Sequence, residues 1–376
     1  MLFKKTNAKS KYDYPLIIFV SILFIFGTLM VFSAGEPYAY AKYGDGYYFI
    51  KRQVIFGAIG ILTMTVAARI PVEIYKRLSK WLYLFTLFLL VLVLIVGFVG
   101  NGAKRWISIG PITIQPSEIA KLSLILMLAK YFSEVDASRE RRSKGDILKY
   151  GTVFPLLIIV VPVVLVMLQK HLSCIIILGL LGLLITVCAG VDTRYIRFCC
   201  VLGGLFVTAF ALFTDYTKER ITVWQNPEAY KLTGGWQTLQ GLMAIGSGGI
   251  FGLGFGNSIM KHCYVSEPAN DMIFAILAEE LGFIGALSLI VLFALLIHRG
   301  FLIGLKSSDT YSRLVAIGIS IKMAIQVLLN IGVVTNTIPN TGISLPFFSY
   351  GGSSLIMIFF EMGLLLSISK NAKITK

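Results

Sequence analysis

Long apolar segments recur along almost the whole chain, and they limit its fold more than any other feature of the sequence. A helix needs roughly 20 apolar residues to cross the hydrocarbon core of a bilayer, and segments of this kind recur from Tyr14 to the C-terminus. Hydrophobic residues fill 56% of the 376 positions and charged residues only 14%, against about 25% charged in soluble domains. The sequence therefore predicts an all-α polytopic membrane protein.

We expect about ten transmembrane helices, in a single domain that fills residues 1–376. The expected ranges are 14–34, 53–68, 81–100, 116–132, 151–168, 172–190, 196–213, 271–297, 314–334 and 352–369. The first exceeds the apolar region of a signal peptide, roughly 7–15 residues long, so we predict that it is retained. The fifth and sixth spans are hardest to divide, because Gln169–Ser173 could form a short turn or a kink.

The net charge of +15 is explained by membrane topology better than by nucleic-acid binding. Lysines and arginines collect in alternate connections: the N-terminal tail, 69–80, 139–149, 194–197, 299–313 and 370–376. Under the positive-inside rule these connections and both termini are cytoplasmic. The five cysteines form no metal-ligand spacing and are interpreted as buried thiols.

Three connections on the opposite, external side have an unusual composition. Residues 101–115 form a glycine-containing turn, and 335–354 are dense in proline, glycine and hydroxyl side chains. The third, about 214–270 between the seventh and eighth helices, is so long that it is either functional or disordered. Its tryptophans and its glycine-rich run favour an ordered loop that lies against the membrane.

Charged side chains within the predicted spans are costly, so they have either functional or paired roles. Glu118 and Lys121 are three residues apart on the fourth span and therefore share one helix face. The sequence leaves open whether they form a structural ion pair or contact substrate. Lys322 and Glu361, on the last two spans, are candidate partners of each other.

Basic residues on the external side are not required by topology and indicate an anionic ligand. Arg52 ends the connection before the second span, and Arg105 lies after the third, beside Lys104. Arginine binds phosphate oxygens in a bidentate manner, so a pyrophosphate-bearing lipid fits this pattern. Asp271, at the external start of the eighth span, is the candidate general base for a glycosyl transfer from such a carrier.

Three stretches together resemble the family of membrane proteins for cell shape, elongation, division and sporulation that includes FtsW, RodA and SpoVE. They are NGAKRWISIG followed by QPSEIAK within 101–121, GFGNSIMKHCYVSEPANDMIFAILAEELG at 254–282, and LPFFSYGGSS at 345–354. The resemblance covers nearly the whole chain. The end of the first span, LMVFSA at 29–34, favours the division and sporulation branch over the elongation branch.

The resemblance implies a peptidoglycan glycosyltransferase that joins lipid II disaccharides at the outer face of the bacterial cytoplasmic membrane. It also implies a class B penicillin-binding protein as partner, together with other division or sporulation membrane proteins. In that family the catalytic aspartate opens the eighth helix, which corresponds here to Asp271. The matching motifs add Gln115, Glu267, Ser349 and Ser353 to Arg52, Arg105, Glu118 and Lys121 as candidate substrate-binding residues.

The sequence departs from the family in two places. Residues 266–272 read SEPANDM, where the common motif is Pro-Glu-Ala-His-Thr-Asp-Phe, and only Glu267 and Asp271 keep their equivalents. His171 stands where an acid is common, so we assign it no catalytic role. No cofactor is indicated, and a divalent cation (Mg²⁺ or Mn²⁺) shared between Asp271 and the pyrophosphate stays open.

Two other functions compete with the enzyme. In a lipid II flippase, Glu118, Lys121, Glu279 and Glu280 would form a polar path across the membrane. In a non-enzymatic scaffold of the division or elongation machinery, helix surfaces would matter and Asp271 would not. The enzyme is favoured because the unusual polar residues gather at the external side, whereas transporter sites lie near the midplane.

Overall fold

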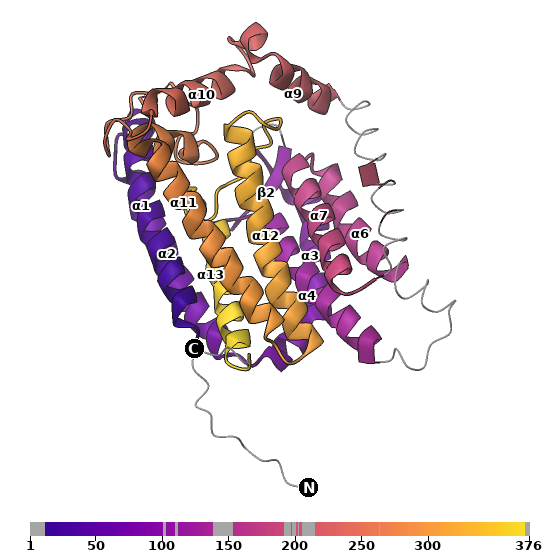
Figure 1. Cartoon of the computed structure of the whole chain (residues 1–376). Helices are drawn as coiled ribbons and strands as arrows, with labels where there is room; N and C mark the ends of the chain where they lie inside the picture. The colour runs from indigo at the N-terminus through magenta and orange to yellow at the C-terminus, as the bar shows by residue number, and fades with distance from the viewer. Residues whose placement is uncertain are drawn as a thin grey trace.

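The structure, a computed structural model, describes residues 12–100, 103–109, 112–137, 153–191, 215–262 and 264–372, with a few isolated positions between 191 and 215. Its core is a bundle of long helices that lie side by side (Figure 1). The bundle consists of α1 (Tyr14–Tyr43), α2 (Tyr48–Arg69), α3 (Val72–Val96), α4 (Pro116–Ala137), α6 (Phe154–Leu168), α7 (Leu172–Cys188), α11 (Ile273–Leu305), α12 (Thr310–Val334) and α13 (Gly352–Ser369). The predicted seventh span and the basic segment 139–149 lie outside the described residues, apart from isolated positions of the span.

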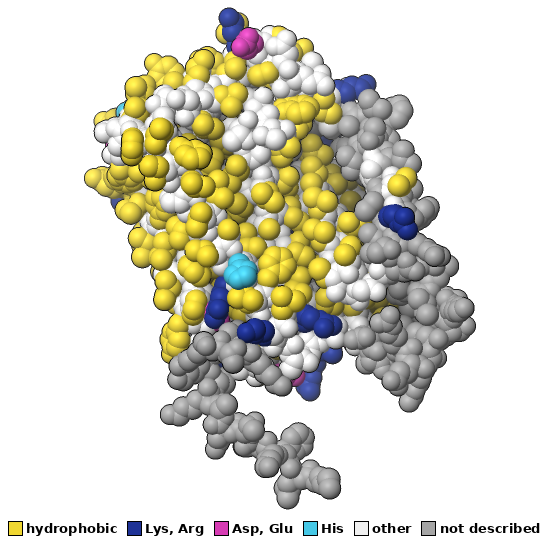
Figure 2. Space-filling view, in the orientation of Figure 1, with side chains coloured by type: hydrophobic (Ala, Val, Ile, Leu, Met, Phe, Trp, Pro, Cys, Tyr) yellow, Lys and Arg dark blue, Asp and Glu magenta, His cyan; other side chains and the backbone are white. Residues whose placement is uncertain are grey.

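The helical membrane fold is confirmed, while the count of ten spans stays a prediction. Among the described residues, α1, α2, α3, α11, α12 and α13 are long and apolar enough to cross a bilayer, and α6 and α7 are shorter apolar helices. Helix α4 is 22 residues long but carries Glu118, Lys121 and Lys130. Figure 2 shows hydrophobic side chains over the middle of the molecule and lysines and arginines gathered at its lower end, as expected of a band that contacts lipid.

Several predicted boundaries were wrong, most of all the end of α1 and the start of α3, because an apolar segment marks the residues that contact lipid and not the ends of the helix. Helix α1 continues beyond Ala34 to Tyr43, where Gly44 ends it in the left-handed conformation (φ 70°). Helix α3 begins at Val72 rather than at 81, so most of the basic connection 69–80 is helical. Tyr75 holds this tight corner by donating a 2.9 Å hydrogen bond to the carbonyl of Ala67.

The connection between the fifth and sixth spans is a short turn between α6 and α7. The two helices run antiparallel, and Gly182 of α7 packs so closely on α6 that a Cβ at this position would lie 2.5 Å from the side chain of Ile159. Gln169 in the turn is buried and donates to the carbonyl of Leu90 at 3.0 Å. This bond ties the turn to α3.

The expectation of an all-α protein was incomplete, because residues expected to form a glycine-containing turn form a small antiparallel sheet. Strands β1 (Phe98–Gly100), β2 (Ala103–Ile109) and β3 (Ile112–Ile114) pair in sequence order. Trp106, Ile107 and Ile109 are aromatic or β-branched residues, which are enriched in strands. The sheet fixes Arg105 and Trp106 in place.

The long loop is ordered over its described residues and lies across the upper end of the bundle (Figure 1). It contains α9 (Asp215–Gln225), a 3-10 turn (Pro227–Tyr230) and α10 (Trp236–Gly248). Helix α10 packs directly on α11, since a Cβ on Gly248 would lie 2.0 Å from the carbonyl of Ala278.

Helix α11 is broken at Gly282, and the glycine-rich segment 249–254 supplies the backbone hydrogen bonds that the helix loses there. Gly282 has φ 65° and ψ −167°, a conformation open essentially only to glycine. The break frees carbonyls of residues 279 and 280, which accept from Leu253 (3.0 Å) and Gly254 (2.9 Å). It also frees the amides of 283 and 284, which donate to the carbonyls of residues 249 and 250. The glycine-rich run therefore satisfies the backbone of a discontinuous helix.

Two buried carboxylates then attach the rest of this segment to the bundle. Glu279 accepts hydrogen bonds from the amides of residues 259 and 260 and from Ser258. Glu280 accepts from Ser33 of α1 at 2.6 Å and pairs with Lys261 at 3.1 Å. The chain that leads to Glu267 and Asp271 is thus fixed to both α1 and α11.

Deeper in the bundle, the predicted pair of Lys322 and Glu361 is confirmed. Lys322 Nζ lies 2.6 Å from Glu361 Oε1, and both side chains are 0% exposed. Glu118 and Lys121 of α4 also pair, at 2.7 Å. The two pairs neutralise four charges where α4, α12 and α13 meet.

We predict that Gly282→Ala strongly destabilises the protein. A Cβ there would lie 2.4 Å from the amide nitrogen of Gly252, in a backbone conformation that by itself costs about 3 kcal/mol for other residues. The melting temperature in detergent should fall sharply. The control is Gly246→Ala in α10, where a Cβ meets no atom within 4 Å; equal effects of the two would contradict the role of the break.

We also predict that Lys322→Met costs about 3–5 kcal/mol, because it leaves Glu361 buried without its cation. The double variant Lys322→Met/Glu361→Leu should recover much of that loss. Thermal unfolding in detergent measures both, with Lys80→Met, an exposed lysine of α3, as control. A double variant no more stable than the single one would show that the pair is not what the fold requires.

Candidate functional site

A cavity of about 650 Å³ lies where the sheet, α10 and the starts of α11 and α13 converge. Its lining includes most of the residues singled out from the sequence: Arg105, Gln115, Glu118, Lys121, Glu267, Asp271 and Ser353. Other lining residues come from the turn before α7, from α9 and from the segment 340–344. Sequence segments that are far apart therefore supply one site.

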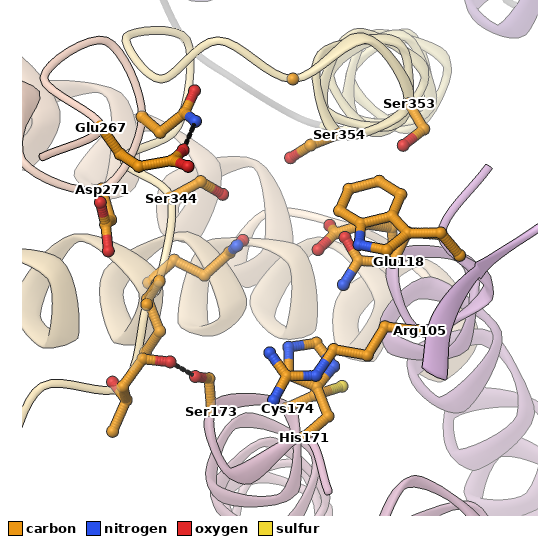
Figure 3. Close-up of a pocket in the computed structure, with 18 of the residues that line it drawn as sticks. Arg105, Glu118, His171, Ser173, Cys174, Glu267, Asp271, Ser344, Ser353 and Ser354 are labelled. Atoms are coloured by element: carbon orange, nitrogen blue, oxygen red, sulfur yellow. Dashed lines mark hydrogen bonds between the residues drawn. The ribbon is translucent and has the colours of Figure 1, made fainter. Parts of the chain in front are cut away.

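Figure 3 shows Glu267 and Asp271 on one side of this cavity; we call these two residues the acidic wall. Asn330 of α12 fixes the backbone of Asp271 by donating to its carbonyl at 2.9 Å. Burial raises the pKa of Asp271 to about 6, and the neighbouring charge of Glu267 adds to this effect. Asp271 therefore titrates close to neutral pH, as a general base requires.

The opposite side of the cavity carries Arg105 and Lys121, which we call the basic wall. Arg105 extends from β2 and donates to the carbonyl of Lys170 at 2.6 Å. His171 lies beside it (Figure 3), and its pKa is well below the usual range because it is buried and faces the charges of Arg105 and Lys121. His171 is therefore neutral, so the positive charge on this wall comes from Arg105 and from Lys121, whose ion-pair partner Glu118 also lines the cavity.

The cavity also contains buried hydrogen-bond acceptors. Within the described part of the chain, no protein group donates to Glu118 Oε2 or Gln326 Oε1, and both residues line the cavity. Unpaired buried acceptors favour a ligand rich in N–H and O–H donors. Sugars with N-acetyl groups have this chemistry.

Two predicted substrate-binding residues do not line the cavity. Arg52 stacks on Tyr48, with Cζ 4.4 Å from the ring centroid, and hydrogen-bonds to Tyr350, which does line it. Ser349 donates to the carbonyl of Asn270 and accepts from the amide of Leu345, both at 2.7 Å. Ser349 therefore supports the turn that presents Asp271.

Sequence reasoning missed three residues that line the cavity on the Asp271 side. Gln237 Nε2 donates to Asp271 Oδ1 at 3.3 Å. Asn340 Nδ2 donates to Gln237 Oε1 at 3.2 Å, and Arg220 donates to the carbonyl of Asn340. The available signal was weak: Gln237 and Arg220 are polar residues in a loop whose length alone indicated function.

The donor set for a metal is limited. Among the described residues no group of three or more His, Cys, Asp or Glu side chains could hold a metal ion. The acidic wall offers two carboxylates, so a divalent cation here would need further oxygens, such as those of a pyrophosphate.

The chain is similar to known proteins over almost its full length. The model of the FtsW, RodA and SpoVE family, described as cell cycle protein, matches residues 14–374. Stage V sporulation protein E of Bacillus subtilis (strain 168) is 40% identical over 371 residues, which cover 98% of this chain and 100% of the relative. A protein of Coxiella burnetii named probable peptidoglycan glycosyltransferase FtsW is 36% identical, covering 97% and 98%.

Solved structures of similar proteins have the same fold. A chain from work described as structural coordination of polymerization and crosslinking by a peptidoglycan synthase complex superimposes with a TM-score of 0.80 at 28% identity, covering 95% of this chain and 97% of that one. The rod shape determining protein RodA of Thermus thermophilus gives a TM-score of 0.71 at 28% identity, covering 97% and 98%. The curated relatives are FtsW and SpoVE proteins, as the end of the first span had indicated. This chain belongs to the FtsW, RodA and SpoVE family of cell cycle proteins.

Proposed function

We propose that this protein is a peptidoglycan glycosyltransferase that polymerises lipid II in cell division or sporulation. The observation that carries the proposal is the single cavity in which Asp271 lies opposite Arg105 and Lys121. A base on one wall and cations on the other suit the transfer of a sugar from a pyrophosphate carrier. Relatives named as peptidoglycan glycosyltransferases support the same reaction.

In the proposed reaction, the ionised carboxylate of Asp271 accepts the proton of the acceptor sugar hydroxyl of one lipid II. The hydroxyl oxygen attacks the anomeric carbon of the growing strand, so a C–O bond forms. The bond from that carbon to undecaprenyl pyrophosphate breaks, and its electron pair leaves with the pyrophosphate. Arg105 and Lys121 would stabilise the negative charge that develops on this group.

The same proposal sets the orientation in the membrane. Lys370 donates to the carbonyl of Ala68 and lies over the ring of Tyr12, so α1 begins and α2 and α13 end at one end of the bundle. The basic residues gather at this end (Figure 2), which the positive-inside rule assigns to the cytoplasm. The cavity would then face outward, in a single domain of residues 1–376 with 214–270 as its outer loop.

The proposed partner is a class B penicillin-binding protein, which would cross-link the strands. A structural neighbour with a TM-score of 0.80 belongs to a peptidoglycan synthase complex that combines polymerisation and crosslinking. This similarity supports a partner for crosslinking, and the family resemblance supplies its class.

A lipid II flippase is less well supported. Glu279 and Glu280 hold the segment 258–261 through buried hydrogen bonds and an ion pair. These contacts give the carboxylates structural work in place, whereas a transport path requires polar groups that a substrate can reach.

We predict that Asp271→Asn lowers the rate of glycan polymerisation by about 10²–10⁴-fold, because the amide cannot accept the proton. The assay follows the lengthening of fluorescent lipid II by the purified protein with a penicillin-binding protein whose transpeptidase site is blocked. Asp45→Asn, an exposed aspartate paired with Lys51, is the control. A folded Asp271→Asn protein with full activity would exclude Asp271 as the base.

We also predict how the rate of polymerisation in this assay depends on pH. A general base acts in its ionised form, and Asp271 has a pKa of about 6, so the rate should rise with pH through about 6 and level off above it. At pH 5 roughly one tenth of the wild-type molecules would carry the ionised base. The lowered rate of Asp271→Asn should lack this acidic limb.

We predict that Arg105→Ala weakens the use of lipid II by about 10–100-fold in kcat/KM, the effect of losing a charge-assisted bond to phosphate. Arg105→Lys should be intermediate, since lysine keeps the charge but loses the bidentate geometry. Lys104→Ala is the matched control, because Lys104 is exposed on the same strand and does not line the cavity. If the two alanine variants behave alike, the basic wall has no special role.

A further inference from the structure

Gln237 lines the cavity, and both its amide nitrogen and its amide oxygen have a hydrogen-bond partner. It is the second residue of α10, which is fixed at its start by Trp236, whose indole nitrogen donates to the carbonyl of Tyr264 at 2.8 Å. The side chain of Gln237 crosses to the acidic wall, where Nε2 lies 3.3 Å from Asp271 Oδ1. Among the described residues, it makes the side-chain hydrogen bond to the Asp271 carboxylate.

The direction of this bond follows from its neighbours. The backbone amide of Gly342 donates to Asn340 Oδ1 at 3.0 Å, and a backbone N–H can only donate. Asn340 must therefore present its Nδ2 to Gln237, whose Oε1 accepts at 3.2 Å. Gln237 is left with Nε2 directed at Asp271. Each amide in the chain Gly342–Asn340–Gln237–Asp271 thus has one orientation.

Contacts that do not involve Gln237 fix the backbone of Asp271 and define the space around its second carboxylate oxygen. Asn330 fixes its carbonyl, as described above, and also donates to the carbonyl of Ile343 at 2.7 Å. Gly342 faces the second carboxylate oxygen, and a Cβ on this glycine would lie 3.8 Å from Oδ2. The missing side chain leaves room beside Oδ2. With the backbone and Oδ1 both fixed, Oδ2 is the oxygen available to a substrate hydroxyl.

We propose that Gln237 is a positioning residue for the reaction: its amide, oriented by Asn340, fixes the rotation of the Asp271 carboxylate so that Oδ2 receives the proton of the acceptor hydroxyl. This proposal depends on the proposed function, in which Asp271 is the base. Gln237 itself contacts Asp271, not the reacting atoms. Its removal should therefore change how well the base works rather than whether a base is present.

The groups around Asp271 that shift its pKa indicate that the pH dependence of the rate is the quantity to measure. Burial and the charge of Glu267 raise the pKa of Asp271, while a hydrogen bond from its own backbone amide, the hydrogen bond from Gln237 and the charge of Arg220 on α9 lower it. A donor to the ionised form favours that form. Loss of the Gln237 bond should thus raise the pKa of Asp271 and move the acidic limb of the rate profile to higher pH.

The test compares Gln237→Met with Gln240→Met, a buried glutamine on the same helix that does not line the cavity. Full-length proteins, each with the partner penicillin-binding protein blocked for transpeptidation, polymerise fluorescent lipid II from pH 5 to 8. For Gln237→Met we expect about tenfold lower kcat, the loss of one hydrogen bond to a charged group, with little change in KM. Its acidic limb should lie at higher pH than in the wild type. Asn340→Ala should shift the limb in the same direction by less, and Gln240→Met should leave it in place.

The outcomes distinguish failure of the positioning role of Gln237 from failure of the proposed function. A lower melting temperature for Gln237→Met with an unmoved acidic limb would show a merely structural role and overturn the positioning role alone. An equal shift in Gln240→Met would overturn it as well. Full activity in Asp271→Asn would instead overturn the proposed function. A shifted limb in Gln237→Met, with a melting temperature equal to that of Gln240→Met, supports the inference.

Discussion

Backbone polar groups in a bilayer have no water to bind, so every break in a helix must be satisfied by protein, and the site depends on how one such break is satisfied. Gly282 interrupts α11, and the glycine-rich segment 249–254 supplies the donors and acceptors that the helix loses. The same segment runs on through residues anchored by Glu279 and Glu280 to the turn that holds Glu267 and Asp271. The position of the candidate base is therefore set by backbone hydrogen bonding below it.

The sequence predicted those features that follow from the cost of charge in lipid. A buried lysine or glutamate must find a partner, and both pairs proposed on this ground, Glu118 with Lys121 and Lys322 with Glu361, are present. Asp271 could be singled out because it begins a span beside external arginines. By contrast, hydropathy could not locate the end of α1 or the start of α3, since α1 continues after its apolar segment stops and α3 begins before its apolar segment starts.

The polar interior of the site could not be predicted for a different reason. Gln237 and Asn340 are 103 positions apart in the sequence, and no helical or strand periodicity connects them. Ser349 lies in a family motif and Arg52 is an external basic residue, yet the structure uses Ser349 to support the turn at Asn270 and joins Arg52 to Tyr350 by a hydrogen bond. A motif identifies a segment as important without saying which side chain faces the ligand.

The carboxylates of the described residues differ in their partners, and this difference distinguishes the structural carboxylates from the candidate base. Glu118, Glu280 and Glu361 each form an ion pair with a lysine, so each has a structural partner that offsets its buried charge. Asp271 instead accepts from a neutral amide and lies beside a second carboxylate. That environment orients the carboxylate while leaving its pKa near 6. A neutral glutamine therefore orients the candidate base, whereas lysines pair with Glu118, Glu280 and Glu361.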